Sequence, residues 1–236
     1  MSASSSGGVI VFLDIDGVLL PFGSNAAAVE PPALFDDACL SALSALLAAP
    51  LPCEPRLVLS STWRAQPAFV ADILDEFRRF GAANDGSPLG AVTAFVDATS
   101  TEHFGARQHE IASWLERRRA QGQAPAAWVC LDDEELLDGE ECAERRAMFE
   151  GHVVQTRSDV GLTAEQAARA VALLRAQLAG SGSTSKRRRG DGEEEGEEYD
   201  ENVTQLPGPA DTFVRGEPHC VEAPPPAPDP AEFGTG

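Results

Sequence analysis

Val9-Ile10-Val11-Phe12-Leu13-Asp14-Ile15-Asp16-Gly17-Val18-Leu19 is the stretch of sequence that decides the fold. Its first five residues are apolar and mostly β-branched or aromatic, which predicts a strand buried on both faces, as in a parallel sheet. Ligands of open α/β sheets bind just beyond the carboxyl ends of such strands, where Asp14 and Asp16 would lie. Gly17 allows the chain to turn away sharply. Because Asp and Gly are also common in surface turns, a plain turn is the alternative.

The composition is that of an acidic globular protein. The chain has 236 residues, of which 43% are hydrophobic, and its formal net charge is −20. Residues 1–180 contain 25 acidic and 13 basic side chains, and residues 181–236 contain 13 and 5, so both parts are negative. This charge argues against long-range, non-specific binding to nucleic acid, but a local site for one phosphate group remains compatible with it.

The N-terminal region and the cysteines indicate the compartment. The apolar run ends at Asp14 after five residues and has no basic segment before it, so we expect neither a signal peptide nor a membrane span. The five cysteines include no C-x-x-C pair, which favours buried, reduced thiols over a zinc site. These features predict a cytoplasmic or nuclear protein without a membrane partner.

Strand and helix patterns alternate along the chain. Short apolar runs predict strands at 9–13, 56–59, 91–96, 126–131 and 152–155. Helical spacing of apolar residues predicts helices at 40–47, 67–81, 107–120, 140–149 and 163–180. This alternation predicts an α/β fold, a three-layer α/β/α domain with a mainly parallel five-stranded sheet.

The predicted domain boundaries follow composition. We expect residues 1–8 to be a disordered N-terminus, 9–180 the folded domain, and 181–236 a disordered, acidic and Pro-rich tail. The basic cluster Lys186-Arg187-Arg188-Arg189 precedes an acidic run in this tail. A nuclear-import signal and a charged linker are both consistent with that pattern.

Acidic or hydroxyl side chains follow three of the predicted strands: Asp14 and Asp16, Ser60 and Ser61, and Asp132 and Asp133. The carboxyl ends of parallel strands share one edge of the sheet, so these side chains would gather in one crevice. Carboxylate oxygens with few neutral ligands suit Mg²⁺, which also binds phosphate oxygens. A carboxylate nucleophile beside such an ion is what an aspartyl-phosphate intermediate requires.

These segments resemble motifs of the haloacid dehalogenase-like (HAD) superfamily. Asp14-x-Asp16-Gly17-Val18-Leu19, Leu57-Val58-Leu59-Ser60 and Asp132-Asp133 are similar to its motifs one, two and four, in a resemblance that covers roughly residues 8–180. The segment Arg107-x-x-Glu110-Ile111-x-x-Trp114-Leu115 is similar to small HAD domains associated with RNA repair proteins. The resemblance implies a Rossmann-like fold with a small helical turn and hairpin within Val18–Pro32.

The resemblance also implies roles for the motif residues. Asp14 would be the nucleophile, and Asp16 would protonate the leaving alcohol and then deprotonate the attacking water. Ser60 would hydrogen-bond the phosphoryl oxygens, with Ser61 as the alternative if the strand slips by one residue. Gly17 is grouped with the residues that bind the substrate.

The resemblance implies ligands for Mg²⁺ from motifs one and four. Asp14 and the main chain of Asp16 would contact the ion, Asp132 would coordinate it, and Asp133 would support it.

The third motif is where this chain departs from the superfamily, which usually has a lysine there. The only lysine of the chain is Lys186, in the tail. We predict that Arg107 replaces it, because arginine stays charged and can fork onto phosphate. Arg64 is a second candidate for a phosphate contact. The alternatives are a surface arginine at a helix start for Arg107 and an ion pair with a nearby acid for Arg64.

The spacing between motifs leaves no room for a lid domain. Only 43 residues lie between Asp16 and Ser60, and 24 lie between Arg107 and Asp132. An open site suits a bulky substrate, such as a phosphorylated protein or a nucleic-acid end, or else excludes water poorly. The acid at Asp16 favours a phosphate ester, since superfamily dehalogenases and phosphonatases lack it.

The sequence therefore predicts a capless, Mg²⁺-dependent phosphatase that acts on a phosphorylated substrate, whether a protein, a nucleic-acid end or a small molecule. Two other functions are weighed against it. One is a HAD-fold binding module that has lost turnover and recruits partners through its acidic tail. The other is a glycosyltransferase with a metal-binding Asp-x-Asp pair, against which the short domain and the position of Asp16-Gly17 argue.

Overall fold

The computed structural model describes residues 7–23, 33–102, 105–138 and 142–183. Its strands are β1 (Val9–Leu13), β2 (Pro55–Leu59), β3 (Asp97–Ala98), β4 (Ala127–Asp132) and β5 (Val153–Gln155). They form one sheet in the order β3-β2-β1-β4-β5, and every pairing between neighbours is parallel. The predicted five-stranded parallel sheet is confirmed.

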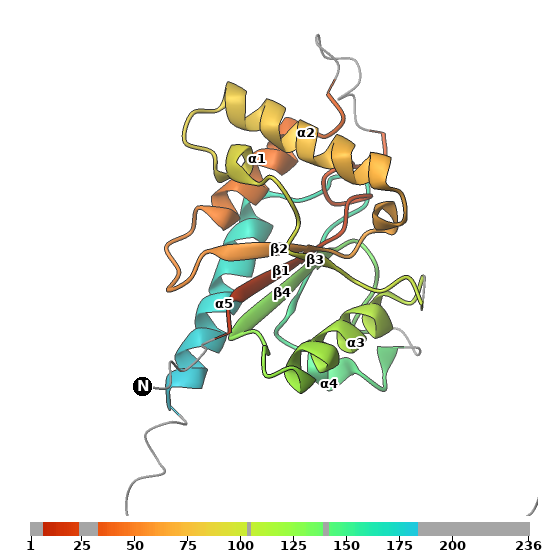
Figure 1. Ribbon diagram of the computed structural model, residues 1–236, viewed down its shortest axis with the longest axis vertical. Coiled ribbons are helices and arrows are strands. Elements are labelled where there is room, and N and C mark those ends of the chain that lie inside the picture. The colour runs from red at the N-terminus through yellow and green to blue at the C-terminus, as the bar shows by residue number, and fades with distance from the viewer. Residues whose placement is uncertain (1–6, 24–32, 103–104, 139–141, 184–236) are drawn as a thin grey trace, which may run out of the picture. The chain divides into compact units, whose positions relative to one another are not determined.

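Helices cover both faces of this sheet (Figure 1). The helices are α1 (Asp37–Leu47), α2 (Pro67–Ala83), α3 (Arg107–Ala120), α4 (Arg146–Phe149) and α5 (Ala164–Ser183), with 3-10 turns η2 (Thr62–Ala65) and η3 (Pro88–Ala91). One hydrophobic cluster joins the sheet to α1, α2 and α5, and a second joins it to α3 and α4. The three-layer α/β/α architecture is therefore confirmed.

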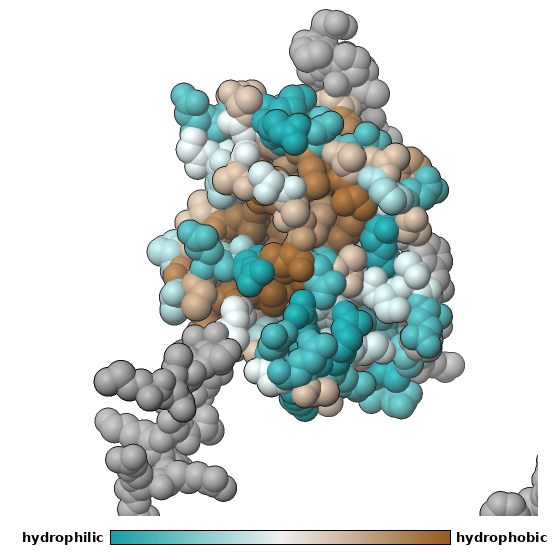
Figure 2. All heavy atoms as spheres, in the orientation of Figure 1, coloured by the Kyte–Doolittle hydropathy of each residue, from teal (hydrophilic) through white to brown (hydrophobic). Residues whose placement is uncertain are grey.

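The central strand β1 shows why its sequence is an uninterrupted apolar run. Val9, Val11 and Leu13 pack against α1, α2 and α5, whereas Ile10 and Phe12 pack against α3 and α4. Successive side chains of a strand point to opposite faces, so a strand covered on both sides needs apolar residues at every position. Figure 2 shows further hydrophobic residues between α2 and α3, whereas the surface of α3 is hydrophilic.

Two predicted elements are misplaced. The predicted strand at 91–96 is wrong, because Pro88–Ala91 forms η3 and the strand is Asp97–Ala98. Pairing with β2 begins only where the Val96 amide donates to the Leu57 carbonyl at 3.0 Å. The predicted helix at 140–149 is shorter, since α4 covers Arg146–Phe149 and residues 139–141 lie outside the described residues.

Helix α5 begins as predicted and ends later than predicted. The Gln166 side chain accepts from the Thr163 amide at 2.9 Å, and the Thr163 hydroxyl accepts from the Gln166 amide at 3.3 Å. This reciprocal capping box satisfies two backbone donors at the helix start. Gly180 does not end the helix, which continues to Ser183. A glycine inside a helix costs only about 1 kcal/mol relative to alanine, so it does not by itself stop one.

Several predictions concern residues outside the described ranges. Residues 1–6 and 184–236, including the basic cluster Lys186–Arg189, are among them, as is the 24–32 part of the predicted hairpin. The small helical turn before it is present, since the amides of Leu19 and Leu20 both donate to the Ile15 carbonyl, at 2.9 and 3.0 Å.

The cysteines in the described ranges are free thiols. Cys39, Cys130 and Cys142 are buried, Cys53 is half-buried, and Cys220 lies outside these ranges. Within residues 7–183, apart from the three gaps, we find no helix with the length and apolar character needed to span a membrane.

Candidate active site

The three motif segments meet at the carboxyl edge of the sheet. Leu13, the last residue of β1, pairs with Leu59 of β2 on one side and with Leu131 of β4 on the other. The Asp14 amide donates to the Leu131 carbonyl at 3.1 Å, and the Ser60 amide donates to the Leu13 carbonyl at 3.0 Å. The sheet hydrogen bonds therefore hold the residues that follow these strands side by side.

Three carboxylates converge at this edge. One side-chain oxygen from each of Asp14, Asp132 and Asp133 lies within 4.8 Å of the other two. Asp14 and Asp132 are buried and Asp133 is half-buried. Burial raises the pKa of Asp14 despite the opposing charge of Arg107, and it raises the pKa of Asp132 well above its usual range. The metal-free cluster thus resists full ionisation.

Arg107, the first residue of α3, reaches into this cluster. Its Nη2 lies 3.1 Å from Asp14 Oδ1, and its Nε lies 2.9 Å from Asp132 Oδ2. Burial alone would lower the pKa of Arg107, but the Asp132 and Asp14 charges outweigh it and raise the pKa. The residue is 6% exposed, so it is not the surface arginine weighed as its alternative. It is a buried cation placed where the resemblance implies one.

Arg64 pairs with Glu110, an acid that also lies near Arg107. Its Nη2 forms an ion pair with Glu110 Oε1 at 2.8 Å, and Glu110 Oε2 lies 3.8 Å from Arg107 Nη1. The Arg64 guanidinium also donates to four backbone carbonyls at 2.6 to 3.0 Å, those of Ser60, Ser61, Thr99 and Ser100. With its side chain 2% exposed, Arg64 has the ion-pair role weighed as the alternative.

The two serines after β2 differ in their contacts, although both are buried. A hydrogen bond from the Ser61 side chain to Asp14 lowers the pKa of that carboxyl, against the larger effect of burial. The Ser60 hydroxyl has no hydrogen-bond partner within the described part of the chain. Ser61, the alternative of the predicted pair, is thus the serine that contacts the predicted nucleophile.

Asp16 lies apart from the three converging carboxylates and has a partner of its own. Its Oδ2 accepts a hydrogen bond from the Trp63 indole Nε1 at 2.9 Å. Both side chains are half-buried. No tryptophan was among the site residues predicted from the sequence. The available signal was the position of Trp63, three residues after Ser60 on the same loop, since a tryptophan near the surface needs an acceptor for its N–H.

Gly17 is required by the close approach of two loops. Its φ is +67°, and a Cβ added there would lie 2.2 Å from Asp133 Oδ2. The Gly17 carbonyl accepts from the Thr156 hydroxyl at 2.8 Å, which ties this turn to the end of β5. A side chain at Gly17 would therefore displace Asp133 from the acidic cluster.

Comparison with known families identifies the domain. Residues 10–167 match the family described as the HAD domain in Swiss Army Knife RNA repair proteins. The chain belongs to this family. The match includes Asp14, Asp16, Ser60, Arg107 and Asp132, and it confirms the resemblance seen in the sequence. Comparisons with curated proteins and with solved structures gave no match.

The acidic cluster of this HAD domain fits a divalent cation such as Mg²⁺. Asp132 Oδ2 is fully buried, and no hydrogen bond to it is found among the residues described, since Arg107 Nε is close but not aligned for one. The three converging ligands are hard carboxylate oxygens, the type that Mg²⁺ prefers. A cation there would offset the burial that raises the pKa of Asp14 and Asp132. Asp14, Asp132 and Asp133 are the side chains that would hold it.

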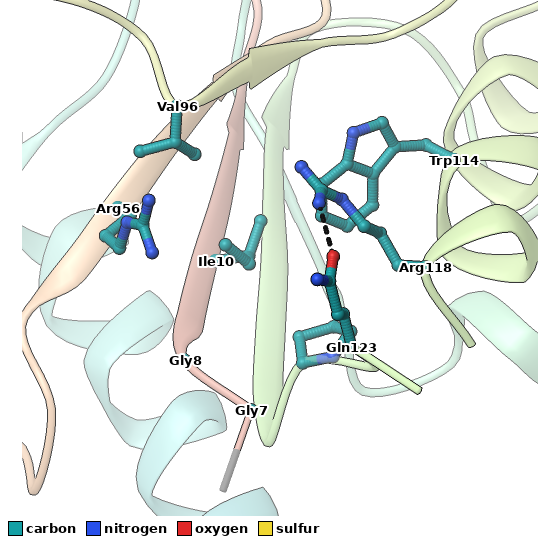
Figure 3. Close-up of a pocket in the computed structure, with 9 residues that line it drawn as sticks. Gly7, Gly8, Ile10, Arg56, Val96, Trp114, Arg118 and Gln123 are labelled. Carbon is teal, nitrogen blue, oxygen red and sulfur yellow. Dashed lines mark hydrogen bonds between the residues drawn. The ribbon is translucent and has the colours of Figure 1, made fainter. Parts of the chain in front are cut away.

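Two surface hollows of the HAD domain differ in their relation to this site. A hollow of about 270 Å³ is lined by residues that include Arg107 and Glu134, so it adjoins the cluster. A larger one, about 370 Å³, lies at the amino ends of the strands (Figure 3) and includes none of the predicted site residues. Arg118, on its wall, donates to Gln123 at 2.8 Å and to Asp97 at 2.9 Å.

Proposed function

We propose that this HAD domain is a Mg²⁺-dependent phosphatase that hydrolyses a phosphate ester through a phosphoryl group carried on Asp14. The observation that carries the proposal is the buried contact of Arg107 with both Asp14 and Asp132. A phosphoryl group brings more negative charge to a site that already holds three carboxylates. A buried cation together with a metal ion would balance that charge.

The first half of the reaction uses Asp14, Arg107 and Asp16. An Asp14 carboxylate oxygen attacks phosphorus, and the bond between phosphorus and the ester oxygen breaks. Asp16 gives its proton to the departing oxygen, which leaves as an alcohol. Arg107 favours the ionised form of Asp14 and offers donors to the phosphoryl oxygens. When bound, Mg²⁺ would neutralise charge on the carboxylates and on the transferred group.

The second half releases phosphate and restores the site. Asp16, now ionised, takes a proton from water while the water oxygen attacks phosphorus. The bond between phosphorus and Asp14 breaks, and inorganic phosphate leaves. Because the indole of Trp63 holds Asp16 Oδ2 at 2.9 Å, one carboxylate oxygen is fixed while the other is available for the proton.

A second candidate is the binding module without turnover. It is favoured by the same arginine, because Arg107 joins Asp14 to Asp132 and also lies 3.6 Å from Glu134 Oε1. An arginine that kept all three contacts would hold the nucleophile away from phosphorus. Such a protein would bind metal or phosphate mimics but would not hydrolyse them.

Hydrolysis of a generic aryl phosphate with Mg²⁺ tests the proposal. Asp14→Asn should lower kcat by about 10⁴-fold or more, as loss of a nucleophile does in other enzymes. Asp75→Asn, at an exposed position of α2, is the matched control and should keep full activity. Equal activity of wild type and Asp14→Asn would refute the assignment of Asp14, and metal binding without turnover would favour the binding module.

A further inference from the structure

A row of three aromatic rings runs from the core to the surface at the carboxyl edge. The ring of Phe35, which is fully buried, lies 6.0 Å from that of Trp63, which lies 5.3 Å from that of Phe69. Trp63 belongs to η2, directly after β2, and Phe69 to the first turn of α2. Phe69 is 39% exposed, so the outer end of the row is open to solvent.

This row is tied to one side of the proposed reaction. Trp63 donates to Asp16, the residue that would protonate the departing oxygen. Trp63, and through it Phe69, would therefore lie beside the group that leaves with this oxygen. Arg107, Asp132 and Asp133 lie instead beside Asp14, where the phosphoryl group would be held. The leaving group is the part of the substrate that would contact Trp63 and Phe69.

We propose that the leaving group is the terminal nucleotide of a single-stranded nucleic acid, and that its base stacks on the Trp63–Phe69 end of the row. The inference rests on the proposed phosphatase function and names its substrate class. Aromatic side chains beside a single-stranded end bind bases through the π-face that every base has, with little sequence preference. The family's association with RNA repair proteins is consistent with such a substrate.

The charges of the site favour stacking over attraction to a phosphate backbone. Residues 1–180 carry 25 acidic and 13 basic side chains, so the domain as a whole repels a long polyanion. Arg64 and Arg107, the arginines that follow β2 and begin α3, are 2% and 5% exposed at their side chains and are engaged by acids. Arg157, after β5, is exposed, but it is paired with Asp159 at 2.7 Å. Affinity for a nucleic-acid end would therefore depend weakly on salt, because few phosphates are neutralised.

The test compares kcat/KM, with Mg²⁺, for short oligoribonucleotides that carry a terminal phosphate. Each 5′- or 3′-phosphorylated oligonucleotide is paired with one whose terminal nucleotide lacks its base, and a phosphotyrosyl peptide serves as a third substrate. Wild type should prefer the intact end by about 5- to 150-fold, the rate equivalent of one stacked base. The 5′ and 3′ arms show which end is used.

Variants of the exposed ring separate stacking from general damage. Phe69→Ala should remove most of the preference for the intact end and leave the rate on the abasic end unchanged. Phe69→Leu keeps the apolar volume without the π-face and should give the same result. Met148→Ala, a control at a residue of similar exposure (37%) on α4, should change neither rate.

Other outcomes would overturn the inference. Equal rates on intact and abasic ends would do so, as would an equal fall of both rates in Phe69→Ala, and faster hydrolysis of the phosphotyrosyl peptide would assign the ring row to protein substrates. Aryl phosphate hydrolysis by the same preparations separates the two proposals. If that activity is present and the base preference is absent, only the substrate class is wrong, whereas loss of both would overturn the phosphatase as well.

Discussion

The two ends of α3 carry arginines in opposite situations. Arg107, at the carboxyl edge of the sheet, has a side chain that is 5% exposed and contacts two buried acids, and its Nε and Nη1 find no aligned hydrogen bond in the described ranges. Arg118, at the amino edge, is 26% exposed and donates to Gln123 and Asp97. Its guanidinium also lies over the Trp114 ring, 5.0 Å from the centroid (Figure 3).

The difference between these two arginines indicates which edge of the sheet has a functional role. A partly exposed ion pair such as that of Arg118 with Asp97 contributes little to stability. Buried charges that lack aligned partners cost stability, and such arrangements cluster where a ligand completes them. The carboxyl edge is thus where a bound cation or phosphoryl group would provide partners for these charges.

Substitution of the two arginines should give the largest contrast. Arg107→Ala removes the buried cation and should lower kcat by about 10²- to 10³-fold, the usual effect of losing one group that stabilises the transition state. Arg107→Lys should recover part of the activity, because it restores the charge without the fork. Arg118→Ala should leave kcat unchanged. Similar losses in Arg107→Ala and Arg118→Ala, measured with an aryl phosphate, would break the comparison.

Thermal unfolding with and without Mg²⁺ tests whether a cation completes the carboxyl edge. The pKa values of Asp14 and Asp132 are raised above 3.8 in the folded protein, so the folded state holds more protons than the unfolded one as the pH rises past 3.8. Without metal, the free energy of unfolding should therefore fall as the pH rises from 3.8 through the raised pKa values of Asp14 and Asp132. Because Mg²⁺ needs ionised ligands, it should restore more of this free energy at pH 7.5 than at pH 5.

The size of this effect and its control follow from linkage. At an Mg²⁺ concentration about 100 times its dissociation constant, the stabilisation should be about 2.7 kcal/mol. Asp132→Asn should abolish the response to Mg²⁺, and Asp97→Asn, on the outermost strand β3, should keep it. A melting temperature that does not respond to Mg²⁺ in the wild-type protein would contradict the metal assignment.

Two tryptophans each donate to an aspartate, which provides a matched pair of smaller substitutions. Trp63 donates to Asp16 at 2.9 Å, and Trp114 donates to Asp97 at 2.8 Å. Trp63→Phe keeps a ring but removes the N–H, and it should lower kcat for an alkyl phosphate by about 10-fold, the value of one hydrogen bond to a charged group.

The aryloxide of an aryl phosphate can leave without full protonation. The kcat for an aryl phosphate should therefore fall less in Trp63→Phe than the kcat for an alkyl phosphate. Trp114→Phe should change neither value. If Trp63→Phe slowed alkyl and aryl phosphates equally, the indole would have a structural role and would not position Asp16.

The smallest expected effect comes from His152 near the amino edge, whose ring stacks on Trp128 with centroids 4.0 Å apart. Burial lowers its pKa below 6.5, against a hydrogen bond to the Trp128 carbonyl. As the pH falls through 6.5 toward the folded value, the unfolded state binds the proton first, so stability should decline. Urea unfolding at pH 7.5 and 5.5 should show a smaller decline in His152→Gln. An identical decline in both proteins would show that His152 does not contribute to this pH dependence.

The sequence predicted the parts of the site that depend on local pattern. The apolar run before Asp14 and the helical spacing after Arg107 place both residues at element ends, and parallel strand ends must share an edge. These regularities made the convergence of Asp14, Asp132 and Asp133 predictable before any coordinates were known.

The remaining details depend on contacts between distant residues. Glu110, from α3, is the acid that forms the ion pair with Arg64. The exact turn after β2 decides that Ser61 contacts Asp14. β3 has two residues, and only its pairing with β2 defines it, so no periodicity marks it in the sequence.

A crystal structure with Mg²⁺ and a fluoride mimic of the phosphoryl group would show whether this edge of the sheet binds both. We expect the mimic on an Asp14 carboxylate oxygen, Mg²⁺ in contact with Asp14 and Asp132, and the Arg107 guanidinium within hydrogen-bond distance of the mimic. The contradicting result is Arg107 still joining Asp14 to Asp132, with neither the ion nor the mimic bound at this edge of the sheet.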